Sequence, residues 1–236
     1  MRQSLLDDNI TPLRYLQCFV VLGICPLNLL GDSTRQHELL DGATVFQTAD
    51  GQTRMYMMPY SSTEYMWQLS FPMDDESEAQ KIQGYQALKD ESWKRCQSWH
   101  VPIPQILEAT PLELVSGYPV YDRALLKAKQ LRQNPRVTLM GDACHPMSPF
   151  KGQGANQAML DALSLANSIY GEMKDGKGSL DKALRQFEEE MLQRSSAKVK
   201  ASAEAAKFLH SEVAIQEGNV TRGAAASLVV EDQKLS

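Results

Sequence analysis

Short runs of β-branched and aromatic residues, separated by polar turns, dominate the first half of the chain and predict strands. We expect these strands at residues 15–24, 44–48, 53–58 and 65–71. Asp50 and Gly51 lie between the second and third of them, and Asp-Gly supplies the positive φ angles of a tight hairpin turn. In the fourth, apolar side chains occupy every second position, which predicts an antiparallel strand with one buried face.

The second half has the spacing of helices. Apolar residues recur at helical intervals in residues 76–96, 154–170 and 180–209, and a short helix is predicted around residues 106–107. We expect Gly171 to end the middle helix, and the chain from about residue 218 onward to be loosely ordered. Two further strands are predicted at residues 112–123 and 136–140, the second of them short and buried.

Composition and charge limit the classes of function that are compatible with the sequence. The 236 residues, 43% of them hydrophobic, suffice for one large domain or two small ones. A net charge of −5 disfavours nucleic acid and anionic lipid as partners. The longest apolar stretch, residues 18–30, is too short to span a membrane, and the N-terminus lacks the apolar region of a secretory signal, so we expect a cytoplasmic protein. Four scattered cysteines are interpreted as small buried hydrophobes.

Residues 137–165 carry the candidate chemistry: a buried strand, a Gly-Asp turn, a loop rich in Pro and Gly, and a helix. Gly-Asp alone is a common turn, but Asp142 directly follows a buried strand, at the edge where α/β sheets bind ligands. Gly152 and Gly154 let a flat ligand approach the backbone. Residues 154–156 open the helix, so their unpaired N–H groups favour an anion or a developing negative charge.

This segment resembles a motif of the FAD-dependent aromatic hydroxylases, the flavoprotein monooxygenases typified by p-hydroxybenzoate hydroxylase. The family motif runs G-D-A-x-H, then P, then G-x-G-x-N, then D-A. The chain matches it without a gap at Gly141-Asp142-Ala143-Cys144-His145, Pro149, Gly152-Gln153-Gly154-Ala155-Asn156 and Asp161-Ala162. Upstream, Tyr121-Asp122-Arg123 resembles the Y-D-R element that ends the family's middle domain.

The resemblance implies a role for each matched position. Asp142, after Gly141, would bind a ribitol or ribose hydroxyl of FAD, and Pro149 would lie beside the isoalloxazine ring at the reaction site. The backbone amides that would face the N1 and C2 carbonyl edge of the flavin belong to Gly152, Gln153, Gly154, Ala155 and Asn156. In the family, NAD(P)H reduces the flavin, and O₂ then supports hydroxylation of an aromatic or related organic substrate.

The resemblance also implies the architecture, a mixed α+β or α/β fold in three parts. Residues 1–124 would form an antiparallel-rich substrate-domain sheet, residues 125–178 the C-terminal part of a p-hydroxybenzoate hydroxylase-like FAD-binding domain, and residues 179–236 a long C-terminal helix and tail.

One departure from the family pattern is large. Family members begin with a G-x-G-x-x-G unit that holds the FAD pyrophosphate, and this sequence contains no G-x-G-x-x-G. We therefore expect about 150 residues of the family pattern to be missing, either from a truncated product or in a natural remnant. The strand at residues 136–140 then lacks neighbours, and the helix from Gly154 exposes a face. We predict that this chain alone binds FAD weakly or not at all.

Several residues keep two interpretations. Arg123 either reaches the flavin or substrate, and so belongs to the cofactor site, or pairs with Asp122 or a nearby carboxylate. Methionines 55, 57, 58, 66 and 73 either line an apolar substrate pocket or, as their strand spacing favours, belong to the core. His145 is interpreted as structural because no second metal-ligand pair accompanies it. His37, His100 and His210 are expected at the surface, and the acidic run 188–190 on a solvated helix face.

Two functions are compatible with the sequence. The first is an FAD-dependent monooxygenase that uses NAD(P)H and O₂ on a small organic substrate, present here as a truncated chain. The second is a catalytically inactive remnant or interaction module that needs a partner chain to complete its fold.

Overall fold

The computed structural model describes residues 2, 5–6, 10–132, 136–176 and 178–217, and divides the chain into two compact units. The sheet unit comprises Gln17–Val120 together with the chain from Phe208 onward. The helix unit comprises Met1–Leu16 and Tyr121–Lys207. The chain passes from one unit to the other within two strands and at the end of the last long helix.

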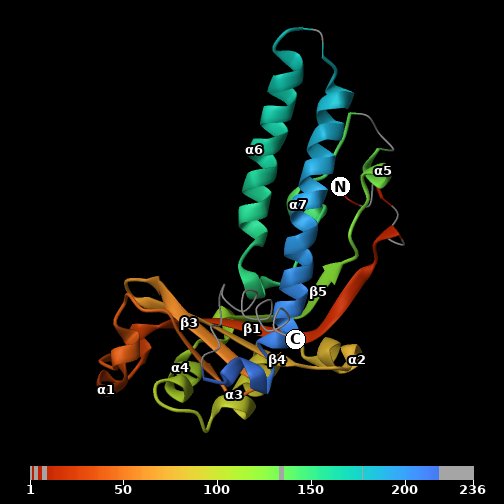
Figure 1. The fold of residues 1–236 in the computed structure, drawn as a ribbon. Helices are drawn as coiled ribbons and strands as arrows, with labels where there is room; N and C mark the ends of the chain where they lie inside the picture. Colours follow the sequence, from red (N-terminus) through yellow and green to blue (C-terminus); the bar gives the residue numbers. More distant parts are fainter. Residues whose placement is uncertain (1, 3–4, 7–9, 133–135, 177, 218–236) are drawn as a thin grey trace, which may run out of the picture. The chain divides into compact units, whose positions relative to one another are not determined.

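The described residues contain one five-stranded sheet with the order β2-β3-β4-β1-β5 (Figure 1). Its strands are β1 (Leu13–Pro26), β2 (Phe46–Ala49), β3 (Arg54–Ser61), β4 (Glu64–Pro72) and β5 (Val115–Arg123). The pairs β2–β3, β3–β4 and β1–β4 are antiparallel. The strands predicted in the first half are therefore confirmed, and the strand predicted from residue 112 begins three residues later, after a short 3₁₀ turn.

Turn chemistry sets the β2–β3 hairpin. Gly51 has a φ of +90°, and the Asp50 carboxylate accepts hydrogen bonds from the amides of Gln52 and Thr53 at 3.0 and 2.6 Å. The side chain of Asp50 thus stabilises the reversal that Gly51 permits. The predicted hairpin is confirmed.

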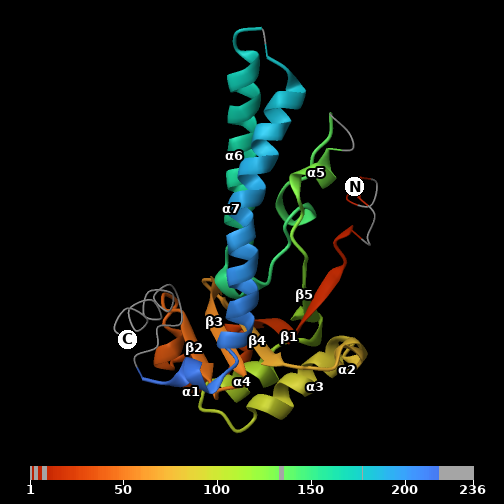
Figure 2. The ribbon, with the colours of Figure 1, turned by 45° about the vertical axis from the view of Figure 1, so that its right-hand side comes forward.

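Strand β4 supplies the centre of the sheet unit's core. Its alternate residues Tyr65, Trp67, Leu69 and Phe71 are all completely buried. The indole N–H of Trp67 donates to Thr110 at 3.0 Å, just beyond the end of α4 (Ile103–Ala109). Helices α3 (Tyr85–Cys96) and α4 lie along one face of the sheet (Figure 2). Alternation along β4 therefore marks the buried face as predicted, although Ser70 on the other face is also buried.

The predicted helix over residues 76–96 is in fact two helices. The helices of the sheet unit are α1 (Asp32–Arg35), α2 (Glu76–Lys81), α3 (Tyr85–Cys96) and α4 (Ile103–Ala109). Asp75 caps α2 by accepting from the amides of Ser77 and Glu78, and Gly84 separates α2 from α3 with a φ of +83°. The left-handed conformation at Gly84 interrupts the helical ladder, which the apolar spacing alone did not reveal.

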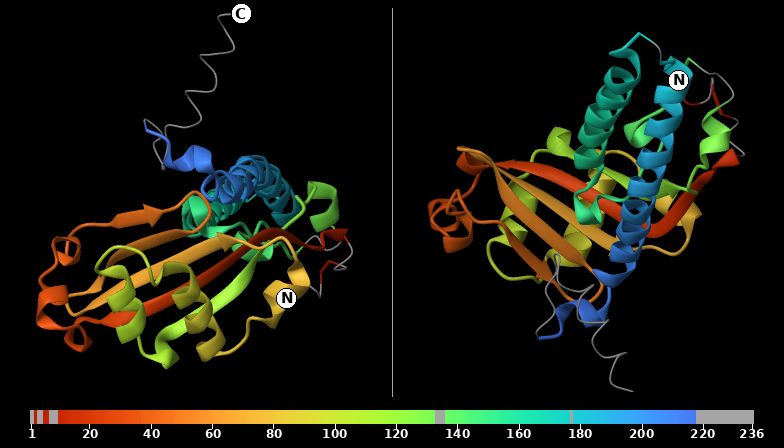
Figure 3. Two further views of the ribbon diagram at one scale, coloured as in Figure 1. Left: turned by 90° about the horizontal axis from the view of Figure 1, so that it is seen from below. Right: turned by 45° about the horizontal axis from the view of Figure 1, so that its top comes forward.

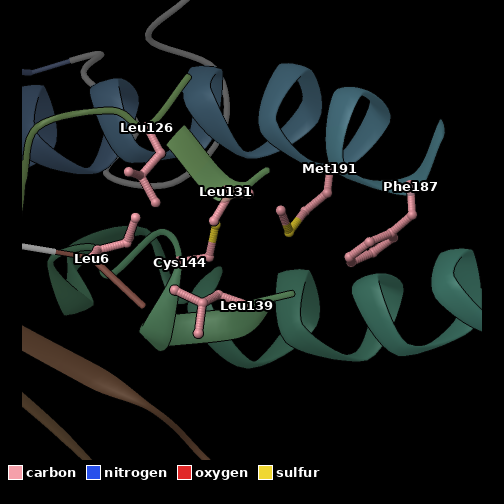
Figure 4. Packing of buried hydrophobic residues seen from close by; sticks show 7 residues of the cluster. All are labelled: Leu6, Leu126, Leu131, Leu139, Cys144, Phe187 and Met191. Carbon is pink, nitrogen blue, oxygen red and sulfur yellow. The ribbon is translucent and has the colours of Figure 1, made fainter. Parts of the chain in front are cut away.

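The helix unit is built on a helical hairpin (Figures 1 and 3). Its helices are α5 (Ala128–Leu131), α6 (Gly154–Met173) and α7 (Leu180–Phe208), the last ending at the first residue of the other unit. Both long helices were predicted, but Gly171 does not end α6, which runs on to Met173. The core of the unit contains Leu6, Leu126, Leu131, Leu139, Cys144, Phe187 and Met191 (Figure 4).

The predicted strand at residues 136–140 is wrong. This segment is irregular, and none of the described strands pairs with it. Leu139 is buried in the core of the helix unit, whereas Val137 is 37% exposed. A strand needs a neighbour for its backbone hydrogen bonds, and the described residues provide none here. The tail predicted to be loosely ordered, from residue 218 onward, lies outside the described residues.

Candidate functional site

The Gly-Asp turn is a single turn of 3₁₀ helix, Gly141–Ala143. Gly141 has a φ of +58°, and its carbonyl accepts from the amides of Cys144 and His145 at 2.8 and 2.9 Å. A Cβ at Gly141 would lie 3.2 Å from the Cβ of Ala158 on α6, tighter than most such contacts. Glycine therefore satisfies both a left-handed backbone and a close approach of this turn to the helix.

The turn places Asp142 at the beginning of α6. The Oδ1 atom of Asp142 lies 3.8 Å from the position that a Cβ on Gly154 would occupy. Asp142 is exposed to solvent, and so are Ala155 and Asn156 in the first turn of the helix. The structure thus brings together the carboxylate and the helix start that the sequence places twelve residues apart.

The first amides of α6 are open. The earliest hydrogen bond of the helix runs from the Gln157 amide to the Gln153 carbonyl at 2.9 Å, and no side chain caps the helix. The amides of Gly154, Ala155 and Asn156 therefore point out of the helix start without an intrahelical acceptor. Together with the helix dipole they form a donor set for an anionic or carbonyl group, beside an acceptor on Asp142. The amides of residues 154–156 and the Asp142 carboxylate fit the flavin end of FAD, which carries an electron-accepting ring and ribitol hydroxyl groups.

A hydrogen bond to α7 and a buried phenylalanine anchor the loop before α6. Pro149 begins a 3₁₀ turn, Pro149–Lys151, which Gly152 closes with a φ of +60° and an amide hydrogen bond to the Pro149 carbonyl at 2.9 Å. Ser148 donates to the carbonyl of Ser202 on α7 at 2.7 Å, and Phe150 is buried. Pro149 and Gln153 are half-buried and Gly152 is exposed, so part of the loop surface remains open to a ligand.

A buried polar network beneath the turn was not predicted. Asp161 on α6 accepts from the Gly141 amide at 2.8 Å and contacts His145 Nε2 at 2.7 Å, and Arg194 on α7 donates to its other oxygen at 2.9 Å. The sequence identified Asp161 as part of the motif but not its contacts. Arg194 lies 33 residues further along, and no local pattern connects the two.

Arg123 contacts the N-terminal segment of the helix unit, where its Nη1 donates to the carbonyl of Thr11 at 2.6 Å. Arg2 joins the same residue to the Gly-Asp turn, because it donates to the Thr11 side chain and, at 2.6 Å, to the Ala143 carbonyl. The completely buried Asp122 forms a bidentate ion pair with Arg14 at 2.8 and 2.7 Å, and these hydrogen bonds raise the pKa of Arg14. The Asp122 carboxylate that the sequence offered as a partner for Arg123 is therefore occupied by Arg14, and contact of Arg123 with a ligand stays a prediction.

The predicted environments of other polar residues hold in part. His145 is buried in the Asp161 network, as its structural interpretation requires. His210 is buried against Ser70 at 2.8 Å, and Glu188 is 3% exposed, so the surface predictions for these two residues are wrong. The other two residues of the acidic run, Glu189 and Glu190, are exposed as predicted. Burial raises the pKa of Glu188. His100 is exposed and His37 half-buried.

The predicted burial of the methionines and cysteines agrees better with the structure. Met55 and Met57 are completely buried, which confirms their place in the core, whereas Met58, Met66 and Met73 are half-buried. The four cysteines are buried free thiols, and burial raises the pKa of Cys18, Cys96 and Cys144 to about 12 and of Cys25 to about 11.

The described residues contain no helix long and apolar enough to cross a membrane. They also contain no group of three or more His, Cys, Asp or Glu side chains placed to hold a metal ion.

Curated relatives match short segments of the chain. FAD-dependent monooxygenase phnB from Penicillium herquei is 41% identical over 85 residues, which are 36% of this chain and 20% of the relative. The 6-hydroxynicotinate 3-monooxygenase of Bordetella bronchiseptica is 43% identical over 67 residues, 28% of this chain and 16% of the relative. The chain's matches thus span about a fifth or less of these relatives' length.

Solved structures share the fold over nearly the whole chain. CtdE in complex with FAD and substrate 4 superposes with a TM-score of 0.71 at 17% identity, covering 99% of this chain and 59% of CtdE. Klebsiella pneumoniae HpxO complexed with FAD and uric acid gives 0.66 at 17% identity, covering 94% and 49%. The mixed fold predicted from the sequence, with its antiparallel sheet and long C-terminal helix, is confirmed.

The sequence profile of the family described as FAD binding domain matches residues 26–202. That range is three quarters of the 236 residues and contains the Gly-Asp turn, the loop and the start of α6. The chain therefore belongs to the FAD binding domain family.

Proposed function

We propose that this chain is the C-terminal part of an FAD-dependent monooxygenase that hydroxylates an aromatic or related planar organic substrate with NAD(P)H and O₂. The observation that carries the proposal is the placement of the Asp142 carboxylate beside the uncapped first amides of α6. Membership of the FAD binding domain family and the monooxygenase names of its relatives support it.

The residues divide the work of holding the cofactor. Asp142, delivered by Gly141, accepts a hydrogen bond from a ribitol or ribose hydroxyl. The amides of Gln153, Gly154, Ala155 and Asn156 would donate to the N1 and C2 carbonyl edge of the flavin and stabilise negative charge there. The Gly152 amide is bound to the Pro149 carbonyl, so Gly152 would instead offer an exposed backbone without a side chain to the ring. When bound, FAD supplies the redox chemistry, taking electrons from NAD(P)H and passing them to O₂.

Pro149 borders the reaction site. It has no backbone N–H and a fixed φ angle, so the loop presents a rigid surface that neither competes for hydrogen bonds nor admits water easily beside the ring. Arg123 is the remaining candidate for the cofactor site. The chain divides, in this proposal, into a substrate-domain sheet (1–124), part of the FAD-binding domain (125–178) and a C-terminal helix and tail (179–236).

The setting of the protein is also proposed. Four buried free thiols suit the reducing conditions of the cytoplasm. The partners are small organic molecules, and a G-x-G-x-x-G unit from a preceding half or a separate chain completes the pyrophosphate site.

A second function is supported by the surface of α6. Met159, Leu163, Tyr170 and Met173 are all roughly half exposed or more, between 48% and 71%. An apolar helix face of this kind suits a partner. The chain is then a catalytically inactive remnant or interaction module, folding fully with a partner chain. A full-length transcript that encodes an in-frame upstream G-x-G-x-x-G unit supports the monooxygenase.

Substrate-stimulated NADPH oxidation with added FAD tests the first function. A panel of phenols and hydroxylated heteroaromatics is screened, and Asp142→Ala is expected to abolish the stimulated rate because the flavin loses its hydroxyl acceptor. Asp181→Ala, which removes an exposed carboxylate on α7, serves as the matched control and keeps the rate. Activity that survives Asp142→Ala contradicts the role of Asp142. Flavin-dependent oxidation that is absent even when a G-x-G-x-x-G domain from a relative is supplied as a separate chain favours the second function.

A further inference from the structure

One buried carboxylate holds both ends of the turn that carries Asp142. Asp161 is completely buried on α6. Its Oδ2 atom accepts from the Gly141 amide at 2.8 Å and lies 2.7 Å from His145 Nε2. Because Gly141 begins the turn and the His145 amide closes it onto the Gly141 carbonyl, a single oxygen fixes both of its ends.

The other oxygen of Asp161 joins the turn to α7. Arg194 donates to Asp161 Oδ1 at 2.9 Å and to Gln157 Oε1 at 2.7 Å, and its Nε donates to Glu190 at 2.7 Å. A buried carboxylate is tolerated when it is paired and hydrogen-bonded, and Asp161 has three donors and one full positive charge. Residues on α6 and α7 thus fix the position of the Asp161 carboxylate, and the carboxylate in turn binds the Gly141–Ala143 turn.

His145 contributes a donor with a defined direction. Its Nδ1 atom is buried and has no hydrogen-bond partner among the described residues, whereas Nε2 contacts Asp161. An ionised carboxylate oxygen only accepts hydrogen bonds, so Nε2 carries a proton and donates to Asp161. Asp161 therefore accepts hydrogen bonds from three donors, and a side chain that carries a donor of its own could not take its place.

Gly141 connects the contacts of Asp161 to the candidate site. Asp142 directly follows Gly141, whose backbone is left-handed and whose amide is bound to Asp161. Rotation of the Gly141 peptide would turn the Asp142 carboxylate away from Gly154. We propose that Asp161 is the positioning residue that aims Asp142 at the first amides of α6, an inference that rests on the flavin site proposed above.

Asparagine is the sharpest probe of this role. Asp161→Asn keeps the shape of the side chain but offers one acceptor oxygen in place of two. Three donors face this side chain, so at least one of them would meet an NH₂ group. The turn should loosen without removal of any packed volume.

Amide hydrogen exchange on the ligand-free chain measures the effect. In Asp161→Asn the Gly141 amide is expected to exchange at least about tenfold faster, while the Met191 amide within α7 keeps its rate. The control Asp181→Asn, whose carboxylate pairs with Arg185 along α7, changes neither rate. An unchanged Gly141 rate in both Asp161→Asn and Asp161→Ala, the second of which leaves no acceptor in any orientation, or equal acceleration at Gly141 and Met191, overturns the proposal.

Substitutions of His145 keep the proposal testable if Asp161→Asn does not fold. His145→Gln retains a donor near the position of Nε2, and His145→Leu removes it. Faster exchange at Gly141 in His145→Leu, largely restored in His145→Gln, supports the role. Equal exchange in the two variants overturns it.

A flavin titration links the role to the site. FAD binding is followed by quenching of flavin fluorescence for the wild type, Asp142→Ala, Asp161→Asn and the double variant, each in the presence of a G-x-G-x-x-G domain from a relative supplied as a separate chain. Asp161→Asn should weaken FAD binding about tenfold when Asp142 is present and cause no further loss when it is absent. Equal losses in both backgrounds overturn the inference. Insensitivity of binding to Asp142→Ala contradicts the proposed flavin site instead, and the exchange rates then decide the role of Asp161.

Discussion

At the scale of single residues, the least replaceable position in the sheet unit carries no side chain. Gly23 on β1 pairs with Trp67 on β4, and a Cβ on Gly23 would lie 2.3 Å from the indole ring. The ring is anchored by its hydrogen bond to Thr110, so it cannot easily shift. Glycine here makes room for the largest side chain in the core.

We therefore predict that Gly23→Ala lowers the free energy of unfolding by about 1 to 3 kcal/mol, the usual cost of overpacking a core. Gly171→Ala is the control, because that glycine lies within α6 with no neighbour within 4 Å. Alanine there should raise stability by about 0.5 to 1 kcal/mol. Urea denaturation measures both, and a Gly23→Ala protein as stable as the wild type would show that the core is loosely packed.

Burial of Glu188 predicts a pH dependence. Burial raises the pKa of this carboxyl, so the folded state binds its proton more tightly than the unfolded state, whose pKa is near 4.5. Its contribution to stability is thus complete below pH 4.5 and is lost as the pH rises through the folded-state pKa.

Glu188→Gln should accordingly stabilise the chain at pH 7 by about 1 kcal/mol and make no difference near pH 4. Arg132 keeps its pair with Glu189 at 2.5 Å in this variant, so no new unpaired charge results. Unfolding free energies at both pH values provide the measurement. A variant that is less stable at pH 7 would indicate that the ionised Glu188–Arg132 pair stabilises the fold.

At the scale of elements, α6 combines a polar buried side with an apolar exposed one. Its two buried residues, Gln157 and Asp161, are polar, and both contact Arg194. Its apolar residues Met159, Leu163, Ala166, Tyr170 and Met173 recur at spacings of four and three residues and are exposed. The usual relation between burial and polarity is thus reversed in this helix.

Leu163→Glu is expected to change the free energy of unfolding by less than about 0.5 kcal/mol, because the side chain is 60% exposed. It should also reduce self-association at high concentration, measured by sedimentation. Phe187→Ala, in the core on α7, is the contrast and should cost about 3 to 5 kcal/mol. If both variants lose stability equally, the α6 face is covered in solution.

At the scale of the whole molecule, this sequence contains only one of the two FAD-binding motifs that the proposed function requires. The chain provides an acceptor on Asp142 and the open amides of α6, but no G-x-G-x-x-G for the pyrophosphate. A dinucleotide held at one end loses much of the binding energy available to it.

The purified chain should therefore contain much less than one FAD per protein, judged by absorbance near 450 nm. Addition of a G-x-G-x-x-G domain from a relative, as a separate chain, should raise FAD affinity, whereas a variant of that domain with its glycines replaced should not. Tight, stoichiometric flavin in the chain alone would contradict this expectation.

Local patterns were sufficient for much of the fold. The Asp50-Gly51 turn, the alternation in β4 and the long apolar spacing of α7 each depend on residues close together in sequence, and each was predicted. The Gly-Asp turn and the start of α6 were also recognised, because their chemistry lies in one contiguous segment.

Predictions failed where distant residues decide the outcome. The environment of Glu188 depends on what packs against α7, the order of residues 136–140 on a neighbouring strand, and the contacts of Asp161 on Arg194 from another helix. The break at Gly84 is an exception, since a glycine inside a helical pattern already allowed it.

The sequence by itself determined most of the strands and long helices and the family motif, because turns, caps and periodicity act over a few residues. Only the tertiary structure decided that the Asp142 carboxylate lies beside Gly154 at the start of α6 and that Asp161 contacts Gly141, His145 and Arg194. Hydrogen bonds between residues far apart in the chain follow from packing, and packing is not written in any local pattern.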